Sequence, residues 1–137
     1  MRFLILAFLF LLKDPSYVQT AGAELVICRT GSFTQERFAL LVNEKLVLED
    51  FHTWTEYRLL LPEGSVKLKT TGNRYLTSNR DYLLELQRGE TYYLEAFTEY
   101  SFLVSSLQLQ VTTSKEFEGF RKRIQKEIVI DLRSYQN

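Results

Sequence analysis

The sequence predicts an all-β sandwich of about seven to eight strands with one short C-terminal helix. Three observations favour this fold class. Apolar and polar residues alternate with a period of two in several short segments, as they do in half-buried strands. These segments recur about every 8 to 12 residues, which is typical of sandwiches and barrels. Turn residues separate them, and a single segment has helical periodicity.

Residues 1–23 are set apart from this domain because they have the layout of a signal peptide. Arg2 precedes the apolar run 3–12, which suits a signal-peptide core of roughly 7 to 15 residues and is shorter than the about 20 that a spanning helix needs. Small residues end the segment, so we expect cleavage after Ala23. The alternative is an uncleaved segment that anchors the chain in a membrane. The sequence thus predicts one domain over 24–137 and a periplasmic or secreted location.

The predicted strands follow one another along this domain. In 107–111, the apolar side chains fall on one face and the two glutamines on the other. Val66–Lys69 alternates in the same way. The segments 25–28, 38–42 and 57–61 are apolar on both parities. This pattern indicates strands that lie deeper, that belong to an interface-facing sheet, or whose edges the terminal elements cover.

Turn chemistry predicts three hairpins between these strands. The turns are Asn43-Glu44-Lys45, Pro62-Glu63-Gly64-Ser65 and Arg88-Gly89-Glu90. Each contains a glycine or asparagine, the residues that best tolerate a positive φ. Residues 72–81 form the longest polar connection.

The C-terminal part predicts the helix. Thr113 and Glu116 have the spacing of a capping box. Phe117, Phe120 and Ile124 then share one helical face. Beyond it, 127–132 is rich in β-formers and is either a further strand or a packed tail.

Composition excludes several function classes. The 17 basic residues balance 17 acidic ones, so the formal charge is zero, and nucleic-acid binding is not expected. Cys28 is the single cysteine and His52 the single histidine. We therefore predict neither a disulfide framework nor a metal site, and no cofactor. Cys28 itself is expected to be a buried small hydrophobe.

Several segments together carry a resemblance. Residues 23–29, the Asn43-Glu44-Lys45 turn, 57–64 and the later stretch 84–93 resemble a family of small bacterial exported proteins, many of them lipoproteins, whose domain has no assigned function. The turn at 62–65 is also similar to that of PEGA domains, small β-sandwich modules of cell-surface proteins. The resemblance implies a prealbumin-like or immunoglobulin-like sandwich outside the cytoplasm, and it implies no catalytic residues.

One departure from that family concerns lipid attachment. A lipoprotein carries its cysteine directly after the small residues, whereas Glu24 follows Ala23 here. Cys28 comes four residues too late and lies within a predicted strand. We therefore expect a protein that is not lipid-anchored.

The strongest catalytic candidate is His52. Asp50 and His52 share a strand face at i and i+2, and Glu56 lies close by in the sequence. A nucleophile elbow is missing, however, and two ligands do not make a zinc site. A solvated loop beside Trp54 explains the same residues, so we predict that the protein is not an enzyme and has no catalytic residues.

Aromatic residues are the feature most open to a binding role. The predicted binding residues are Tyr82, Tyr92, Tyr93, Tyr100 and Trp54. Tyr92 and Tyr93 are adjacent, so they point to opposite faces of one strand. If exposed, these side chains form an amphipathic patch for a protein or glycan; otherwise they belong to the core, as strand aromatics often do. Phe97 and Phe102 are expected in the core.

The sequence therefore predicts a non-enzymatic exported module of the bacterial cell envelope that binds another envelope or host component, an extracellular protein or a glycan. Recognition would use the aromatic patch or an exposed strand edge. The alternative is a carrier of a small ligand or glycan, held in a groove between sheet and helix. Membrane contact is expected only if the N-terminal segment is retained.

Overall fold

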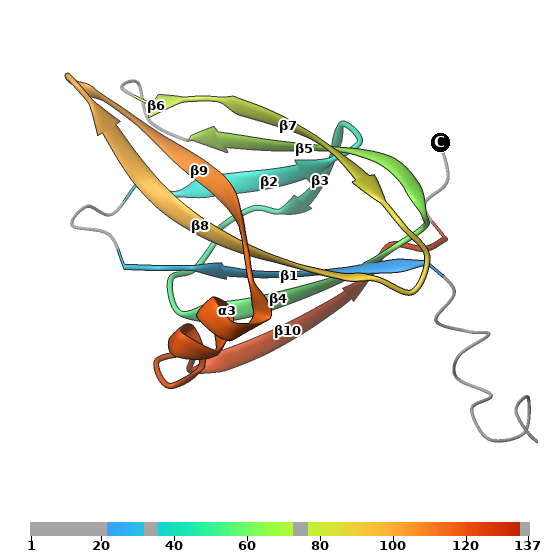
Figure 1. Cartoon of the computed structure of the whole chain (residues 1–137). Coiled ribbons are helices and arrows are strands. Elements are labelled where there is room, and N and C mark those ends of the chain that lie inside the picture. Colours follow the sequence, from blue (N-terminus) through green and yellow to red (C-terminus); the bar gives the residue numbers. More distant parts are fainter. Residues whose placement is uncertain (1–21, 32–35, 73–76, 135–137) are drawn as a thin grey trace, which may run out of the picture.

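The computed structural model describes residues 22–31, 36–72 and 77–134. In this part of the chain, ten strands and one helix form an all-β sandwich of two sheets (Figure 1). The large sheet contains β1 (Ala23–Arg29), β4 (Thr55–Leu61), β6 (Thr77–Ser78), β8 (Thr91–Ser101), β9 (Val104–Thr112) and β10 (Lys126–Asp131). The small sheet contains β2 (Phe38–Val42), β3 (Lys45–Leu48), β5 (Gly64–Gly72) and β7 (Arg80–Leu86). The helix is α3 (Ser114–Arg121).

The predicted fold class is confirmed, but the predicted strand number is too low. The strand order is β10-β4-β1-β8-β9-β6 in the large sheet and β3-β2-β5-β7 in the small one. The two-residue β6 lies within the expected polar connection 72–81, and it is too short to produce any periodicity. The segment left open as strand or tail is β10, which pairs in parallel with β4.

The predicted signal peptide lies outside the described residues, except for Gly22 and Ala23. Ala23 is the first residue of β1 and pairs with Leu61. The expected cleavage after Ala23 therefore falls just inside β1.

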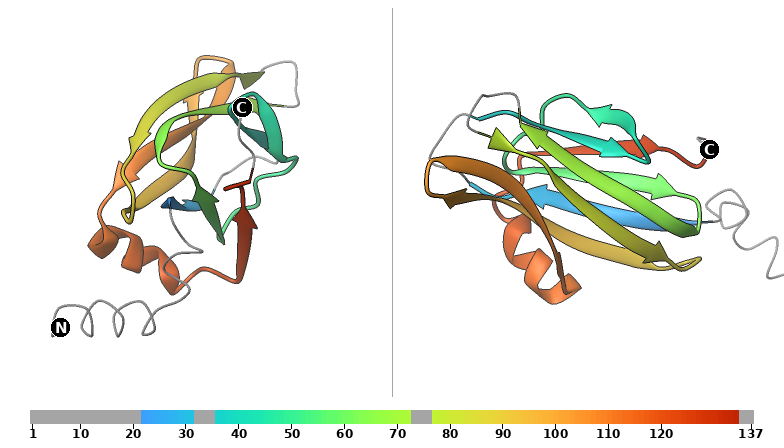
Figure 2. Two further views of the ribbon diagram at one scale, coloured as in Figure 1. Left: turned by 90° about the vertical axis from the view of Figure 1, so that its right-hand side faces the viewer. Right: turned by 90° about the horizontal axis from the view of Figure 1, so that it is seen from above.

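Strand β1 is covered on both faces, as its apolar pattern predicts. Leu25 and Ile27 are completely buried in the main core between the sheets. Val26 and Cys28 point the other way and form a second cluster with Phe117 of α3. The helix therefore acts as a third layer over the outer face of the large sheet (Figure 2).

Capping and ion pairs hold α3 in place. The Thr113 hydroxyl accepts a hydrogen bond from the Glu116 amide at 3.1 Å, as the capping spacing predicts. Arg121 reaches the sheet, where its Nη1 lies 2.8 Å from Glu56 Oε1. Arg58 binds the other oxygen of Glu56 at 3.3 Å. The Glu56 side chain is 1% exposed, so two guanidinium groups compensate its burial.

One of the three predicted hairpins is confirmed and two are wrong. Asn43 and Glu44 have φ values of 48° and 67° and form the tight turn between β2 and β3. The turn after Leu61 and the turn at Gly89 instead carry the chain from one sheet to the other. The same turn residues serve both kinds of connection, because they specify the local φ and not the pairing of the flanking strands.

The sandwich is closed along one side and open along the other. On the closed side, Thr70 Oγ1 donates to the Leu107 carbonyl at 2.7 Å, which joins β5 to β9. The Tyr82 hydroxyl of β7 accepts from the Leu109 amide at 2.9 Å and donates to Gln108 Oε1 at 3.0 Å. On the opposite side, the sheets end at β3 and β10 (Figure 2, left).

Candidate functional site

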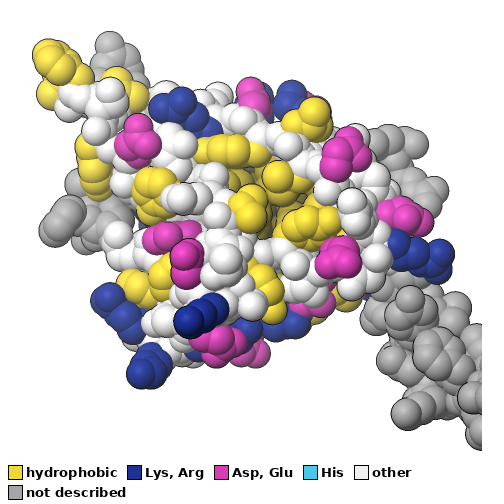
Figure 3. Space-filling view, in the orientation of Figure 1, with side chains coloured by type: hydrophobic (Ala, Val, Ile, Leu, Met, Phe, Trp, Pro, Cys, Tyr) yellow, Lys and Arg dark blue, Asp and Glu magenta, His cyan; other side chains and the backbone are white. Residues whose placement is uncertain are grey.

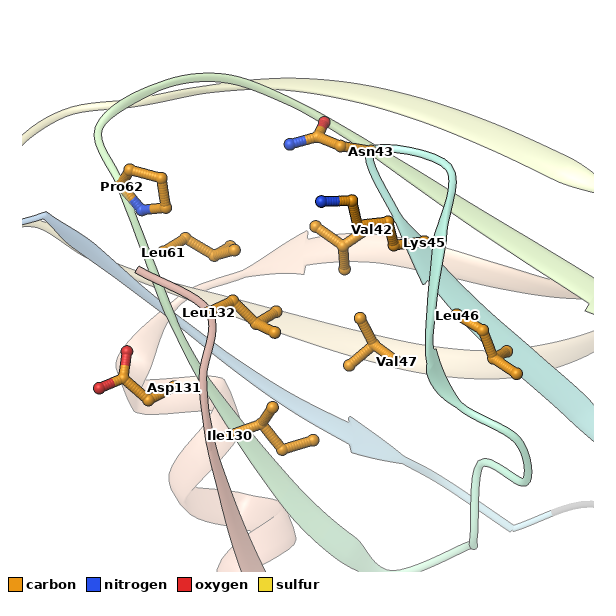
Figure 4. Close-up of a pocket in the computed structure, with 10 residues that line it drawn as sticks. All are labelled: Val42, Asn43, Lys45, Leu46, Val47, Leu61, Pro62, Ile130, Asp131 and Leu132. Atoms are coloured by element: carbon orange, nitrogen blue, oxygen red, sulfur yellow. The ribbon is translucent and has the colours of Figure 1, made fainter. Parts of the chain in front are cut away.

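A groove lies on the open side of the sandwich, between β3 and β10. Its volume is about 350 Å³. The residues that line it are Val42, Asn43, Lys45, Leu46, Val47, Leu61, Pro62, Ile130, Asp131 and Leu132. Seven of these are apolar, and they come from β2, β3, β4 and the end of β10 (Figure 4). The groove is a concavity with mostly apolar walls, which makes it the candidate binding site.

The floor of the groove is the main core itself. Val42, Leu61 and Leu132 are 5%, 2% and 5% exposed, respectively. Val47 of β3 and Ile130 of β10 are half-buried against this core and point toward the same space from opposite walls (Figure 4). Because none of the described strands covers them, these walls present hydrocarbon to whatever enters the groove.

Hydrogen bonds fix the two ends of the groove. At one end, Asn43 Oδ1 accepts from the Lys67 amide at 2.9 Å, which holds the β2–β3 turn to β5. At the other, the Leu132 amide donates to the Leu60 carbonyl at 2.8 Å. Since both ends are tied to neighbouring strands, the groove is preformed.

A charged pair marks the rim. Asp131 lies 2.6 Å from Arg133 Nη2 and 2.9 Å from its Nε, a bidentate geometry. These hydrogen bonds from Arg133 lower the pKa of Asp131 to about 2. The carboxylate is therefore ionised at every physiological pH, and the apolar groove has a polar border at this end.

The walls also provide strand edges. β10 pairs with β4 and β3 pairs with β2, and each is the outermost described strand of its sheet. An outermost strand has one row of backbone groups that its own sheet does not pair. The site thus combines an apolar cavity with two strand edges beside it.

The five predicted aromatic residues do not meet in one patch. Tyr82 and Tyr92 pack against the main core, and the Tyr92 hydroxyl accepts from the Gln87 amide at 2.9 Å. Tyr93 and Trp54 pack instead on the cluster beneath α3. Tyr100 lies apart from both pairs, toward the β8–β9 turn, and is 45% exposed. The predicted binding residues thus divide among three places.

Tyr93 and Trp54 make contacts within the chain that give them a structural role. The rings of Tyr93 and Phe117 are 5.2 Å apart. The Arg123 guanidinium lies 3.9 Å from the centre of the Trp54 ring, a cation–π geometry. Trp54 has a φ of 53°, and its backbone joins Arg29 and Gln125. These two aromatics hold the end of α3 against the sheet.

The expectation for Phe102 is wrong. Its side chain is 100% exposed, because it occupies the turn between β8 and β9 and not a strand. Phe97 is half-buried on β8. An aromatic residue in a β-rich segment resembles a core residue by sequence, and this turn contains no glycine or asparagine that would reveal it.

The residues around His52 have separate partners. Asp50 pairs with Arg37 at 3.7 Å, whereas Glu56 is buried between two arginines beneath α3. His52 is exposed, and its amide donates to the Tyr57 hydroxyl. Among the residues that the structure describes, no three His, Cys, Asp or Glu side chains are grouped to hold a metal ion.

Cys28 is completely buried, as predicted. Burial, together with Glu56 and Glu95, raises the pKa of its thiol to about 11. The thiol is therefore protonated at neutral pH and unreactive.

Sequence reasoning missed both the groove and a buried arginine. Arg29 is 3% exposed and donates to the Phe51 carbonyl at 2.7 Å and to Thr98 Oγ1 at 3.3 Å. Burial lowers the pKa of this guanidinium from its ordinary value. Its role is to join β1 and β8 to the loop before β4. A charged residue at the end of an apolar strand is the sequence signal that could have pointed to it.

Comparisons with known proteins identify no relative. A scan against protein-family models finds no match, and a search among curated proteins finds none either. The relation to PEGA domains thus stays a prediction. No helix in 22–31, 36–72 or 77–134 is long and apolar enough to cross a membrane.

Proposed function

We propose that this protein is an interaction module that binds a short apolar polypeptide segment in the groove between β3 and β10. One observation carries the proposal: an apolar cavity opens between two strands that each end a sheet. A bound segment inserts its apolar side chains between Val47 and Ile130. Its backbone then pairs with an edge strand, which is the usual mode of β-strand addition. The predicted signal peptide supports a location of this binding in the cell envelope.

A polypeptide fits this site better than a small ligand does. Pockets for small molecules combine apolar walls with a few inward polar groups that orient the ligand. Of the three polar lining residues, Asp131 is engaged by Arg133 and Asn43 by Lys67, and both lie toward the rim. The third, Lys45, is exposed at the start of β3. The groove therefore offers hydrocarbon and strand edges, which together suit an apolar peptide.

A carrier of a small apolar ligand is the second candidate. The observation that favours it is the volume of about 350 Å³, which falls within the range of roughly 300 to 1,000 Å³ for ligand sites.

The experiment compares two probes in the whole chain by NMR. The first probe is a blocked peptide of alternating valine and serine, and the second is the dye anilinonaphthalene sulfonate. We expect the peptide to shift backbone amide signals of β10 or β3 together with methyl signals of Val47 and Ile130. Saturable binding of the dye alone would support the carrier and refute the peptide module.

Matched variants test whether binding uses the groove. Ile130→Phe places a ring in the groove and is expected to abolish peptide binding. Val129→Phe places the same ring on the opposite face of β10, where Val129 is 63% exposed, and should leave binding intact. If both variants bind the peptide like the wild type, the groove is not the site.

A further inference from the structure

The hairpin of β8 and β9 ends in an exposed apolar tip. Ser101 pairs with Val104, so Phe102 and Leu103 form a two-residue turn. Phe102, Leu103 and Val104 are 100%, 70% and 38% exposed, respectively. Figure 3 shows the tip as hydrophobic side chains that project from the upper left of the molecule. We refer to residues 102–104 as the apolar tip.

The backbone makes the choice of phenylalanine at this turn unusual. Phe102 has a φ of 57°. Turns with a positive φ at their first central residue normally have glycine there, because a β-carbon is unfavourable in this conformation. The ring is fully exposed, and among the residues that the structure describes it gains no packing to offset that cost. A contact outside the chain would account for it.

The apolar tip and the groove lie at opposite ends of the molecule. β1 and β8 are parallel, with Glu24 beside Thr91, and β8 runs from there to the tip. β4 runs the other way and ends at Leu61, which lines the groove. Figure 1 shows the β8–β9 turn and the end of β4 at opposite sides of the view.

The apolar tip suits the groove in size and charge. A cavity of about 150 Å³ with aliphatic walls accommodates benzene, so about 350 Å³ accommodates a phenyl ring together with an aliphatic side chain. From Ser101 to Ser106 the hairpin carries no charged side chain. The tip therefore brings no charge of its own into the groove, most of whose lining is apolar.

We propose that the apolar tip of one copy of this chain occupies the groove of a second copy, and this inference rests on the proposed function of the groove. The two surfaces differ, so the contact is head-to-tail. Each bound copy still presents one free tip and one free groove. Such a contact yields an open series of oligomers unless the geometry closes it into a ring.

Sedimentation velocity of the whole chain over a wide range of concentration tests the inference. We expect the average mass to rise with concentration. Phe102→Asp, whose side chain tolerates a positive φ, should weaken association about tenfold or more. Leu83→Asp is the control, because Leu83 is 73% exposed on β7 away from the tip. Association of Phe102→Asp equal to that of the wild type would overturn the inference.

A mixing experiment tests which surfaces meet. Phe102→Asp retains its groove and Ile130→Phe retains its apolar tip. Each variant alone should stay monomeric, and an equimolar mixture should form a dimer with one copy of each. Val47→Phe replaces Ile130→Phe if the latter does not fold. A mixture that stays monomeric overturns the inference.

The peptide and the dye used to test the groove distinguish a failure of this inference from a failure of the proposed function. Suppose that the peptide binds and Ile130→Phe abolishes its binding, but the wild type stays monomeric. The proposed function then stands, and a second copy of the chain is excluded as the occupant of the groove. If the wild type instead binds phosphatidylcholine vesicles and Phe102→Asp does not, the tip contacts lipid and the inference is refuted.

Discussion

Replacing Phe117 with alanine should remove the buried apolar contact between α3 and the sheet. Phe117 is the one buried residue of this helix, and it packs against Val26 and Cys28. Removing a buried phenyl ring from an apolar environment costs about 1.5–3 kcal/mol in transfer free energy. Val26 and Cys28 belong to a strand paired on both sides and cannot move in to fill the space, so the cavity adds to this cost. We expect a total loss of about 3–5 kcal/mol.

Urea denaturation followed by circular dichroism measures this loss. Lys115→Ala, an exposed change in the first turn of the same helix, should alter the free energy of unfolding by less than about 0.5 kcal/mol. A loss below about 1 kcal/mol for Phe117→Ala, with an unchanged m-value, would refute the role of Phe117 in packing. A reduced m-value would instead show that the native state has already released α3.

Four further predictions concern single sites. Iodoacetamide at pH 8 should modify Cys28 far more slowly in the native protein than in urea, because its pKa is raised to about 11; equal rates would contradict its burial. Thr113→Ala should lower the free energy of unfolding by about 1 kcal/mol through loss of the helix cap, and Thr113→Ser should retain most of it. Phe102→Gly should raise the free energy of unfolding by up to about 1 kcal/mol, because glycine adopts the positive φ without strain; a clear loss would show that the ring packs within the chain. The pKa of Asp131 is lowered from 3.8 to about 2. Its ion pair with Arg133 therefore stabilises the fold at pH values above 3.8, and this stabilisation is lost as the pH falls toward 2. Arg133→Gln should raise that pKa toward its usual range in an NMR titration, although the backbone amide of residue 133 still donates to the carboxylate.

Residue patterns predict elements well where one element covers another. The alternation in 107–111 and the double-sided apolar pattern of 25–28 both follow from burial, since each face of β1 has its own cover. The helix follows from Thr113 and from the spacing of Phe117 and Phe120. These features are local, and a periodicity of two or 3.6 residues reports them directly.

Connections between elements are predicted less well, because turn residues report only the local backbone. Asn43 and Gly89 both adopt a positive φ, yet the first joins neighbouring strands and the second joins the two sheets. The difference arises from long-range pairing of β8 with β1. A single sequence contains no signal for that partner.

The groove was not predictable because its residues are chemically ordinary. By residue type, Val47, Ile130 and Leu132 are indistinguishable from core residues. In a sandwich closed on both sides they would lie in the core. They line a groove because the two sheets are joined at β9 on the other side and no described strand bridges β3 and β10. The function of such residues depends on which edge of the sandwich is left open.

The charges along the groove restrict what can bind there. β10 begins with Lys126 and Glu127 and ends with Asp131, and all three are exposed. Charged residues at the ends of an edge strand oppose pairing with a long strand. The apolar residues 128–130 between them leave room for a segment of two or three apolar side chains. A tight turn such as the apolar tip presents its side chains within that length, whereas a longer strand would have to place its own ends against these charges.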